Sequence, residues 1–219
     1  MDKLTFGAMG AFALCLLMTM APTRAATAGP VEDGVAEIQR EWAQIRYQRP
    51  PAERVRLFED LAAKAHRLSE AQPQRSEPLV WEGIVVSSLA GEKGGLGALG
   101  LVKKAKSLYE DAIRIEGSVL EGSAYNSLGV LYYKVPGWPI GFGDKAKARE
   151  LLQKALSISP NGIDANYFYG EYLVETGRRG DAVAYLERAL AAPARPGRQV
   201  ADEGRRAEAR ELLERARAH

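Results

Sequence analysis

The chain has 219 residues, 46% of them hydrophobic, and its formal net charge at pH 7 is +2. This length is enough for one domain with a continuous apolar core, and the near-neutral charge excludes the strongly basic surface typical of nucleic-acid-binding proteins. Cys15 is the one cysteine, so stability must come from packing rather than from intrachain disulfides.

Residues 1–28 have the pattern of a secretory signal peptide. Lys3 gives a short basic start, an apolar and uncharged segment runs from Phe6 to Ala21, and Ala26-Thr27-Ala28 is a small-x-small cleavage site. The apolar segment is shorter than the roughly 20 residues that span a bilayer as a helix. We therefore expect cleavage and export of residues 29–219, with membrane attachment only if the signal stays uncleaved.

The segment after the signal shows the apolar spacing of amphipathic helices. Two helices are expected over 33–72, where Pro50-Pro51 interrupts the pattern. Two more cover about 77–117 and are separated by the glycine-rich stretch 91–100. This stretch contains Gly95-x-Gly97-x-x-Gly100, but no strand precedes it, so we interpret it as a connector rather than as a phosphate-binding loop.

Two later stretches, about 122–160 and 163–194, share one spaced pattern with an interval of 34 residues. The pattern W-x2-L-G-x2-Y, A-x3-F, P at this period is the signature of tetratricopeptide-repeat (TPR) helix pairs. The matching positions are Tyr125, Leu128, Gly129, Tyr132, Ala148, Leu152, Ala155 and Pro160 in the first stretch, and Asn166, Tyr169, Gly170, Leu173, Ala182, Leu186, Ala189 and Pro193 in the second.

Gly129 and Gly170 are expected inside helices, where glycine costs roughly 1 kcal/mol relative to alanine. A helix accepts this cost where another backbone must come close. We therefore predict that these glycines, together with Ala148, Ala155, Ala182 and Ala189, let neighbouring helices nest. A single hairpin cannot bury both of its faces, so the hairpins must stack. The predicted fold is an all-α, TPR-like α-solenoid of antiparallel helix hairpins, with a degenerate repeat over 77–117 and capping helices over 33–72 and 199–217.

Three local signals predict helix ends. Ser118 and Glu121 have the spacing of a capping box, in which each side chain bonds to the backbone of the other. Asp144 is expected to cap the helix that contains Ala148, and Gly177 is available for a left-handed C-terminal cap.

The connector 135–143 is seven residues longer than its counterpart in the second repeat and carries Trp138, Ile140 and Phe142. Loops between paired helices are usually short. Packing of these side chains against the neighbouring repeat is favoured, because soluble proteins rarely expose large apolar patches. The alternative, an apolar anchor for a partner, stays open, and we predict that Trp138 and Phe142 contribute to partner binding.

Chemistry-bearing residues are sparse. His66 and His219 are the two histidines, and no cluster has the spacing of a metal site or a nucleophile with its base. The arginines of 195–219 alternate with acidic residues, which is typical of a solvated helix face. We therefore expect neither an enzyme nor a metal or cofactor, and no nucleic-acid partner.

The stretch from Asn126 through the aromatic Pro-Gly insertion to Asp144 resembles a set of uncharacterised exported TPR proteins of Gram-negative bacteria. The resemblance extends through Asn161–Gly170 and Arg195-Pro-Gly-Arg198 and covers about residues 77–216. More remotely, the helix-insertion-helix layout is similar to TPR proteins associated with TRAP transporters. The resemblance implies a TPR fold and a periplasmic location, and it implies no substrate.

In TPR stacks the first helix of each pair lines a concave groove, which suits an extended peptide or helix. The residues expected to face this groove are Asn126, Val130, Tyr133, Tyr167, Glu171 and Val174. The predicted function is an exported scaffold for a protein or peptide partner in the periplasm. The alternatives are a carrier of a small apolar ligand, linked to a transporter, whose cavity lies under the 135–143 loop, and a structural assembly factor of the envelope.

Overall fold

The structure is a computed structural model that describes residues 29–95 and 97–218. The expected signal peptide, residues 1–28, lies outside the described residues. The described chain forms α-helices joined by turns, and none of these helices is long and apolar enough to cross a membrane. The helices are α1 (Pro30–Gln48), α2 (Pro51–Ala71), α3 (Ser76–Lys93), α4 (Ala98–Glu116), α5 (Val119–Lys134), α6 (Lys145–Ile158), α7 (Ile163–Glu175), α8 (Arg179–Ala191) and α9 (Gln199–Arg217).

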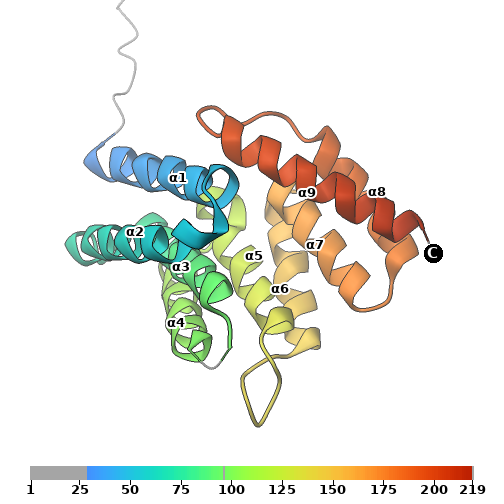
Figure 1. The fold of residues 1–219 in the computed structure, drawn as a ribbon, viewed down its shortest axis with the longest axis horizontal. Coiled ribbons are helices and arrows are strands. Elements are labelled where there is room, and N and C mark those ends of the chain that lie inside the picture. Colours follow the sequence, from blue (N-terminus) through green and yellow to red (C-terminus); the bar gives the residue numbers. More distant parts are fainter. Residues whose placement is uncertain (1–28, 96, 219) are drawn as a thin grey trace, which may run out of the picture.

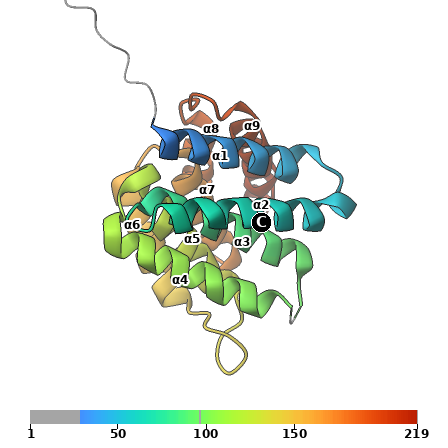
Figure 2. The ribbon, with the colours of Figure 1, turned by 90° about the vertical axis from the view of Figure 1, so that its left-hand side faces the viewer.

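Consecutive helices pair as hairpins that stack along the molecule (Figure 1). The pairs are α1 with α2, α3 with α4, α5 with α6, and α7 with α8, and α9 packs against both helices of the last pair. A view from the side shows the same layers (Figure 2). The predicted all-α stack of helix hairpins is confirmed.

The inner helices close into a ring. Along the inner side, α1 contacts α3, α3 contacts α5, α5 contacts α7, and α7 contacts α9. The start of α9 lies beside the end of α1, and these two helices contact each other (Figure 1). The helices expected to cap opposite ends of the stack therefore meet, which an open solenoid does not require.

Small residues bring the helices of each repeat close together. A Cβ atom added at Gly129 would lie 2.8 Å from Cγ of Leu152 and 3.3 Å from the carbonyl oxygen of Ala148. A Cβ at Gly170 would lie 2.9 Å from Leu186. The alanines of the pattern are fully buried on the second helices: Ala148, Ala155, Ala182 and Ala189. These are the close approaches that the repeat pattern predicts.

The degenerate repeat over 77–117 uses the same packing with a larger side chain. A Cβ at Gly83 in α3 would lie 2.5 Å from Cε1 of Tyr109 in α4. Tyr109 is fully buried, and its hydroxyl lies 3.0 Å from Ser87 Oγ. An aromatic ring here takes the place that Leu152 and Leu186 occupy in the two regular repeats.

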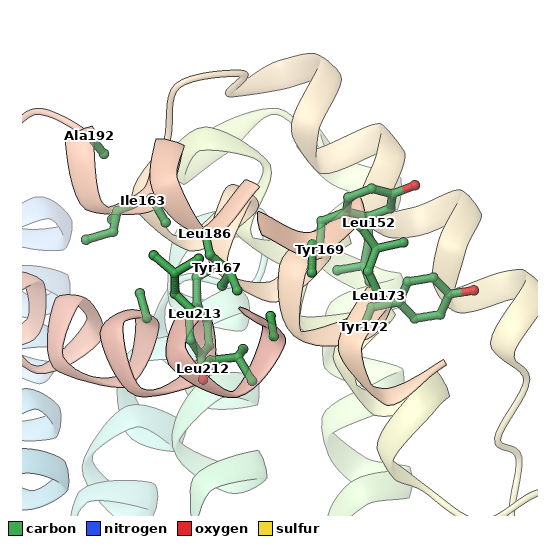
Figure 3. Packing of buried hydrophobic residues seen from close by; sticks show 14 of the residues in the cluster. Leu152, Ile163, Tyr167, Tyr169, Tyr172, Leu173, Leu186, Ala192, Leu212 and Leu213 are labelled. Carbon is green, nitrogen blue, oxygen red and sulfur yellow. The ribbon is translucent and has the colours of Figure 1, made fainter. Parts of the chain in front are cut away.

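One apolar cluster joins the last helices (Figure 3). Leu152 of α6, Leu173 of α7 and Leu186 of α8 are buried together with Leu212 and Leu213 of α9. Because α9 contributes apolar side chains to the same cluster as the repeats, it is held firmly at the end of the stack. This attachment positions the other face of α9 toward α1.

The helix ends differ from prediction at one place. Asp144 caps α6 as expected, accepting hydrogen bonds from the backbone N–H groups of Ala146 and Lys147 at 2.8 and 3.0 Å. Gly177 has a φ of 83° at the end of α7, as a left-handed cap requires. The capping box at Ser118 and Glu121 is wrong, because the Ser118 side chain makes no capping hydrogen bond.

The start of α5 is instead a left-handed turn. Leu120, Glu121 and Gly122 have φ values of 50°, 58° and 74°. This backbone directs the Glu121 carboxylate away from Ser118 and toward Ser159, whose hydroxyl donates a hydrogen bond to it at 3.1 Å. Left-handed conformations are rare for residues other than glycine, and they cluster at functional sites.

Candidate ligand cavity in the helix ring

The ring of inner helices surrounds a cavity of about 620 Å³. Its lining comes from α1, α3, α5, α7 and α9 and from the segment before α9, with Tyr109 as the contribution from an outer helix. This volume lies within the range of about 300–1,000 Å³ that is usual for small-molecule sites. The concave face of the stack therefore holds a half-open cavity, which the contact between α1 and α9 bounds on one side.

Aromatic rings form one part of the wall. Trp42 of α1 and Trp81 of α3 meet edge to face with their ring centroids 6.0 Å apart. The indole N–H of Trp42 donates a hydrogen bond to Ser88 Oγ at 2.8 Å, which fixes the ring. On the opposite helices, Tyr167 and Phe168 of α7 also pack edge to face, at 5.0 Å.

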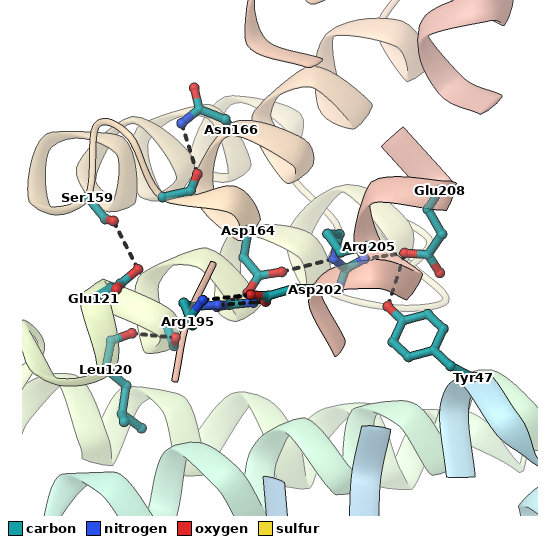
Figure 4. A network of polar contacts seen from close by, with 12 residues as sticks. Tyr47, Leu120, Glu121, Ser159, Asp164, Asn166, Arg195, Asp202, Arg205 and Glu208 are labelled. Carbon is teal, nitrogen blue, oxygen red and sulfur yellow. Dashed lines mark hydrogen bonds and ion pairs between the residues drawn. The ribbon is translucent and has the colours of Figure 1, made fainter. Parts of the chain in front are cut away.

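Charged side chains form the other part of the wall (Figure 4). Asp164 at the start of α7 accepts hydrogen bonds from Arg195 at 2.8 Å and from Arg205 at 2.9 Å. Arg195 also binds Asp202, a buried residue of α9, through two nitrogens at 2.9 and 2.6 Å. Burial acts to raise the pKa of Asp164, but the positive charges of Arg205 and Arg195 outweigh it and hold that pKa well below its usual value.

Arg205 stands at the centre of this network. Its side chain is 11% exposed, and its guanidinium carbon lies 4.6 Å from the ring centroid of Tyr167 and 4.3 Å from that of Phe168. It also pairs with Glu208 at 2.6 Å. The network thus joins the aromatic and the charged parts of the wall.

The seam between α1 and α9 closes the ring. Arg46 of α1 pairs with Glu208 of α9 at 2.8 Å, and the hydroxyl of Tyr47 donates to the same carboxylate at 3.3 Å. The Tyr47 ring packs against Gly204, where an added Cβ would overlap the ring. Burial, opposed by the charge of Arg205 and assisted by that of Glu208, raises the pKa of Tyr47 to about 12. The tyrosine therefore stays a neutral donor at physiological pH.

The predicted groove residues divide between the cavity and its surroundings. Tyr167 and Glu171 line the cavity, as does Val130. Tyr133 does not line the cavity. Its side chain is buried, and its hydroxyl donates a hydrogen bond to the carboxylate of Glu171. Asn126 is also turned inward, 5% exposed and outside the cavity lining, so its assignment to the groove is corrected.

The aromatic residues of the 135–143 loop lie away from the cavity. Figures 1 and 2 show the loop projecting from one end of the α5–α6 hairpin. Trp138 is 90% exposed and Ile140 is 61% exposed. Phe142 instead packs edge to face on Tyr132 of α5, with centroids 5.5 Å apart. Its contact with the neighbouring hairpin is made by Lys106 of α4, whose Nζ lies 5.8 Å from the Phe142 ring centroid. The expected packing on the neighbouring repeat is thus seen for Phe142 and not for Trp138 or Ile140, and the loop does not line the cavity.

The sequence did not predict the buried charged residues of the cavity wall. The pattern of alternating charges over 195–219 indicated a solvated helix face, whereas Arg195, Asp202 and Arg205 lie inward in the network. The signal that separates them is position: Arg195 lies in the segment before α9, and Asp202 and Arg205 lie in its first turns, where the helix meets α1. Among the described residues, no group of three or more histidine, cysteine or acidic side chains could hold a metal ion.

Comparison with known proteins supports the fold. Residues 140–199 match the tetratricopeptide-repeat family. A thermophilic TPR protein of Thermus thermophilus has a crystal structure similar to this chain, with a TM-score of 0.54 and 16% identity, over 83% of this chain and 99% of that one. The fold is a TPR-like α-solenoid. TPR repeats generally form interaction scaffolds rather than active sites.

Two crystal structures of MamA are also similar to this TPR-like chain. One has 20% identity and a TM-score of 0.45 over 75% of this chain and 90% of that one. The other has 18% identity and a TM-score of 0.44 over 84% and 91% of the two chains. No protein of curated function matches the sequence.

Proposed function

We propose that this protein is a non-catalytic binding scaffold of the bacterial periplasm that encloses a compact ligand inside its helix ring. The observation that carries the proposal is the closure of α9 onto α1 around a cavity of about 620 Å³. A closed ring favours a ligand that the protein surrounds over a long peptide lying in an open groove. The periplasmic location rests on the signal-peptide pattern of residues 1–28.

A neutral aromatic dye tests whether the cavity takes up a ligand. We expect N-phenyl-1-naphthylamine to gain fluorescence on binding the wild-type protein at one saturable site. Gly91 of α3 is exposed and lines the cavity, and a Cβ added there meets no atom within 4 Å. The Gly91→Trp variant should therefore occupy the opening without a clash and weaken dye binding at least tenfold.

Gly91→Ala is the matched control, because it makes the same backbone change with a side chain too small to fill the opening. It should bind the dye like the wild type. Absence of a saturable site in the wild type, or equal affinity of Gly91→Trp and Gly91→Ala, would contradict a ligand cavity.

A second candidate function is binding of a protein partner through the 135–143 loop. The exposure of Trp138 and Ile140 supports it, because large apolar side chains at such positions are typical of interaction surfaces and tryptophan is enriched among binding hot spots. Backbone hydrogen bonds from Gly143 to Pro136 at 2.9 Å and from Asp144 to Tyr132 at 2.8 Å hold the base of the loop. These hydrogen bonds therefore hold the loop that carries Trp138 in place.

We expect the double variant Trp138→Ser/Phe142→Ser to lose partners that the mature wild-type protein captures from envelope extract. Because Phe142 packs on Tyr132, the single variant Trp138→Ser separates lost binding from lost packing and should lose the same partners with an unchanged thermal midpoint. Ile115→Ser, a change at a 37% exposed residue of α4, is the control. Retention of all partners and of stability by the double variant would reject this role.

A further inference from the structure

Arg198 differs from the other arginines of the cavity wall. It directly precedes α9 and lines the cavity, and its guanidinium carbon lies 5.1 Å from the ring centroid of Trp81. Its Nε is buried and has no hydrogen-bond partner among the described residues. Trp81 is a 4% exposed residue that also lines the cavity, and its indole nitrogen is likewise buried without a partner among the described residues. Both nitrogens are covered by protein atoms, whereas the Arg198 side chain as a whole is partly exposed and makes no ion pair among the described residues.

The charges around Arg198 are already matched to one another. Arg195 pairs with Asp164 and Asp202, and Arg205 pairs with Asp164 and Glu208, which also binds Arg46 across the seam. The ion pairs of the described chain leave Arg198 out. Burial, and then repulsion from Arg195, lower the pKa of Arg198 and outweigh the opposing attraction of Asp164 and Asp202. Arg198 is partly buried, and a charge in such a place is unfavourable without a partner, because buried charges in proteins are normally paired.

We propose that Arg198, whose guanidinium lies over the ring of Trp81, holds the carboxylate of the ligand, and that the ligand is a compact organic acid with an apolar body. This inference rests on the proposed function of the cavity as a ligand site. The planar guanidinium offers parallel N–H donors that match the two oxygens of a carboxylate. The Trp81 ring supports the guanidinium from one side, and Trp42 and Ile84 offer apolar surface to the body of the acid.

The charge balance favours a carboxylate over a phosphate monoester. The ion pairs leave Arg198 out, but the cavity lining as a whole has five basic and five acidic side chains, so each negative charge of a ligand is costly and a carboxylate brings only one. A phosphate monoester carries close to two at neutral pH. The second charge would meet the carboxylates of Asp164 and Glu208, which line the same cavity. A monoanion therefore fits this wall better.

Displacement of N-phenyl-1-naphthylamine by two matched probes tests the proposal. The probes are 1-naphthylacetate and its neutral isostere 1-naphthylacetamide, each added to the wild type and to Arg198→Gln, Arg198→Lys and Arg149→Gln. We expect the carboxylate to bind the wild type at least tenfold more tightly than the amide. Arg198→Gln should abolish this preference, Arg198→Lys should restore part of it, and Arg149→Gln, a change at an exposed residue of α6, should keep it.

A second pair of probes identifies the source of the carboxylate. The tripeptide Ala-Ala-Trp is compared with a free and with an amidated C-terminus. If the acid binds more tightly than the amide in the naphthyl pair but not in the peptide pair, the ligand is a free organic acid. Preference in the peptide pair alone means that the carboxylate is a peptide C-terminus, which keeps the role of Arg198 and overturns the free acid.

The stability of the ligand-free protein gives an independent readout. If Arg198 lacks a counter-charge, Arg198→Gln should raise the thermal midpoint, by about 2–4 °C for a domain of this size if one buried charge is relieved. A purely structural arginine would instead lower it. Equal binding of acid and amide, binding of neither, or a lowered midpoint in Arg198→Gln overturns the carboxylate site. Saturable dye binding in the same samples would show that the cavity function stands without it.

Discussion

Replacement of Arg205 by methionine is expected to destabilise the protein by about 3 kcal/mol, measured as a lower urea midpoint with an unchanged slope. The Arg205 side chain is 11% exposed and holds Asp164 and Glu208 at 2.9 and 2.6 Å. Breaking a buried pair by removing one partner costs typically about 3–5 kcal/mol, because the remaining charge is left without compensation. The lower end applies here, since Asp164 keeps Arg195 and Glu208 keeps Arg46.

Arg46→Met is the matched control for this prediction. Arg46 binds the same Glu208 carboxylate, but its side chain is 39% exposed, and exposed pairs contribute about 0–1 kcal/mol. Equal losses in the two variants would mean that burial of the network does not decide its energy. Because Arg205 also lies over the rings of Tyr167 and Phe168, its loss should weaken dye binding as well.

Replacement of Gly129 by leucine is expected to cost about 3 kcal/mol, the upper part of the range for overpacking. Even a Cβ atom there would lie 2.8 Å from Leu152 and 3.3 Å from the backbone oxygen of Ala148, so α5 and α6 must separate to admit the longer side chain. For a domain of this size the thermal midpoint should fall by about 6–12 °C.

Gly180→Leu provides the comparison, because a Cβ at Gly180 in α8 meets no atom within 4 Å. This variant should not lower the midpoint, because it replaces a helix glycine without a clash. An unchanged midpoint in Gly129→Leu would contradict the close packing on which the repeat architecture depends.

The residues of the cavity show where prediction from sequence stopped. Tyr167 and Glu171 were found because they sit on the inner face of a repeat helix, a position that the 3.6-residue period defines. Asn126 and Tyr133 were assigned to the groove from the same helical period, but their side chains are buried in the protein. Ser123, Ser127 and Val130 of the same helix line the cavity instead, and the left-handed turn at the start of α5 was indicated by no capping pattern.

The arginines before and within α9 were missed for a different reason. Alternating charges describe an exposed helix when nothing else packs on it, and the pattern over 195–219 satisfies that description. In the structure, the start of α9 lies against α1, more than 150 residues earlier in the chain, so part of the same pattern is buried. Local periodicity contains no information about a contact over such a separation.

Helix positions, hairpin pairing and the nesting of glycine on leucine follow from local spacing, because each depends on residues a few turns apart in one repeat. The ring, its cavity and the unpartnered Arg198 follow from the curvature that four stacked hairpins accumulate. That curvature brings Tyr47 onto Gly204 and Arg46 onto Glu208, and it is a sum of small rotations at every interface. Only the assembled packing fixes that sum, and with it whether the concave face stays open or encloses a ligand.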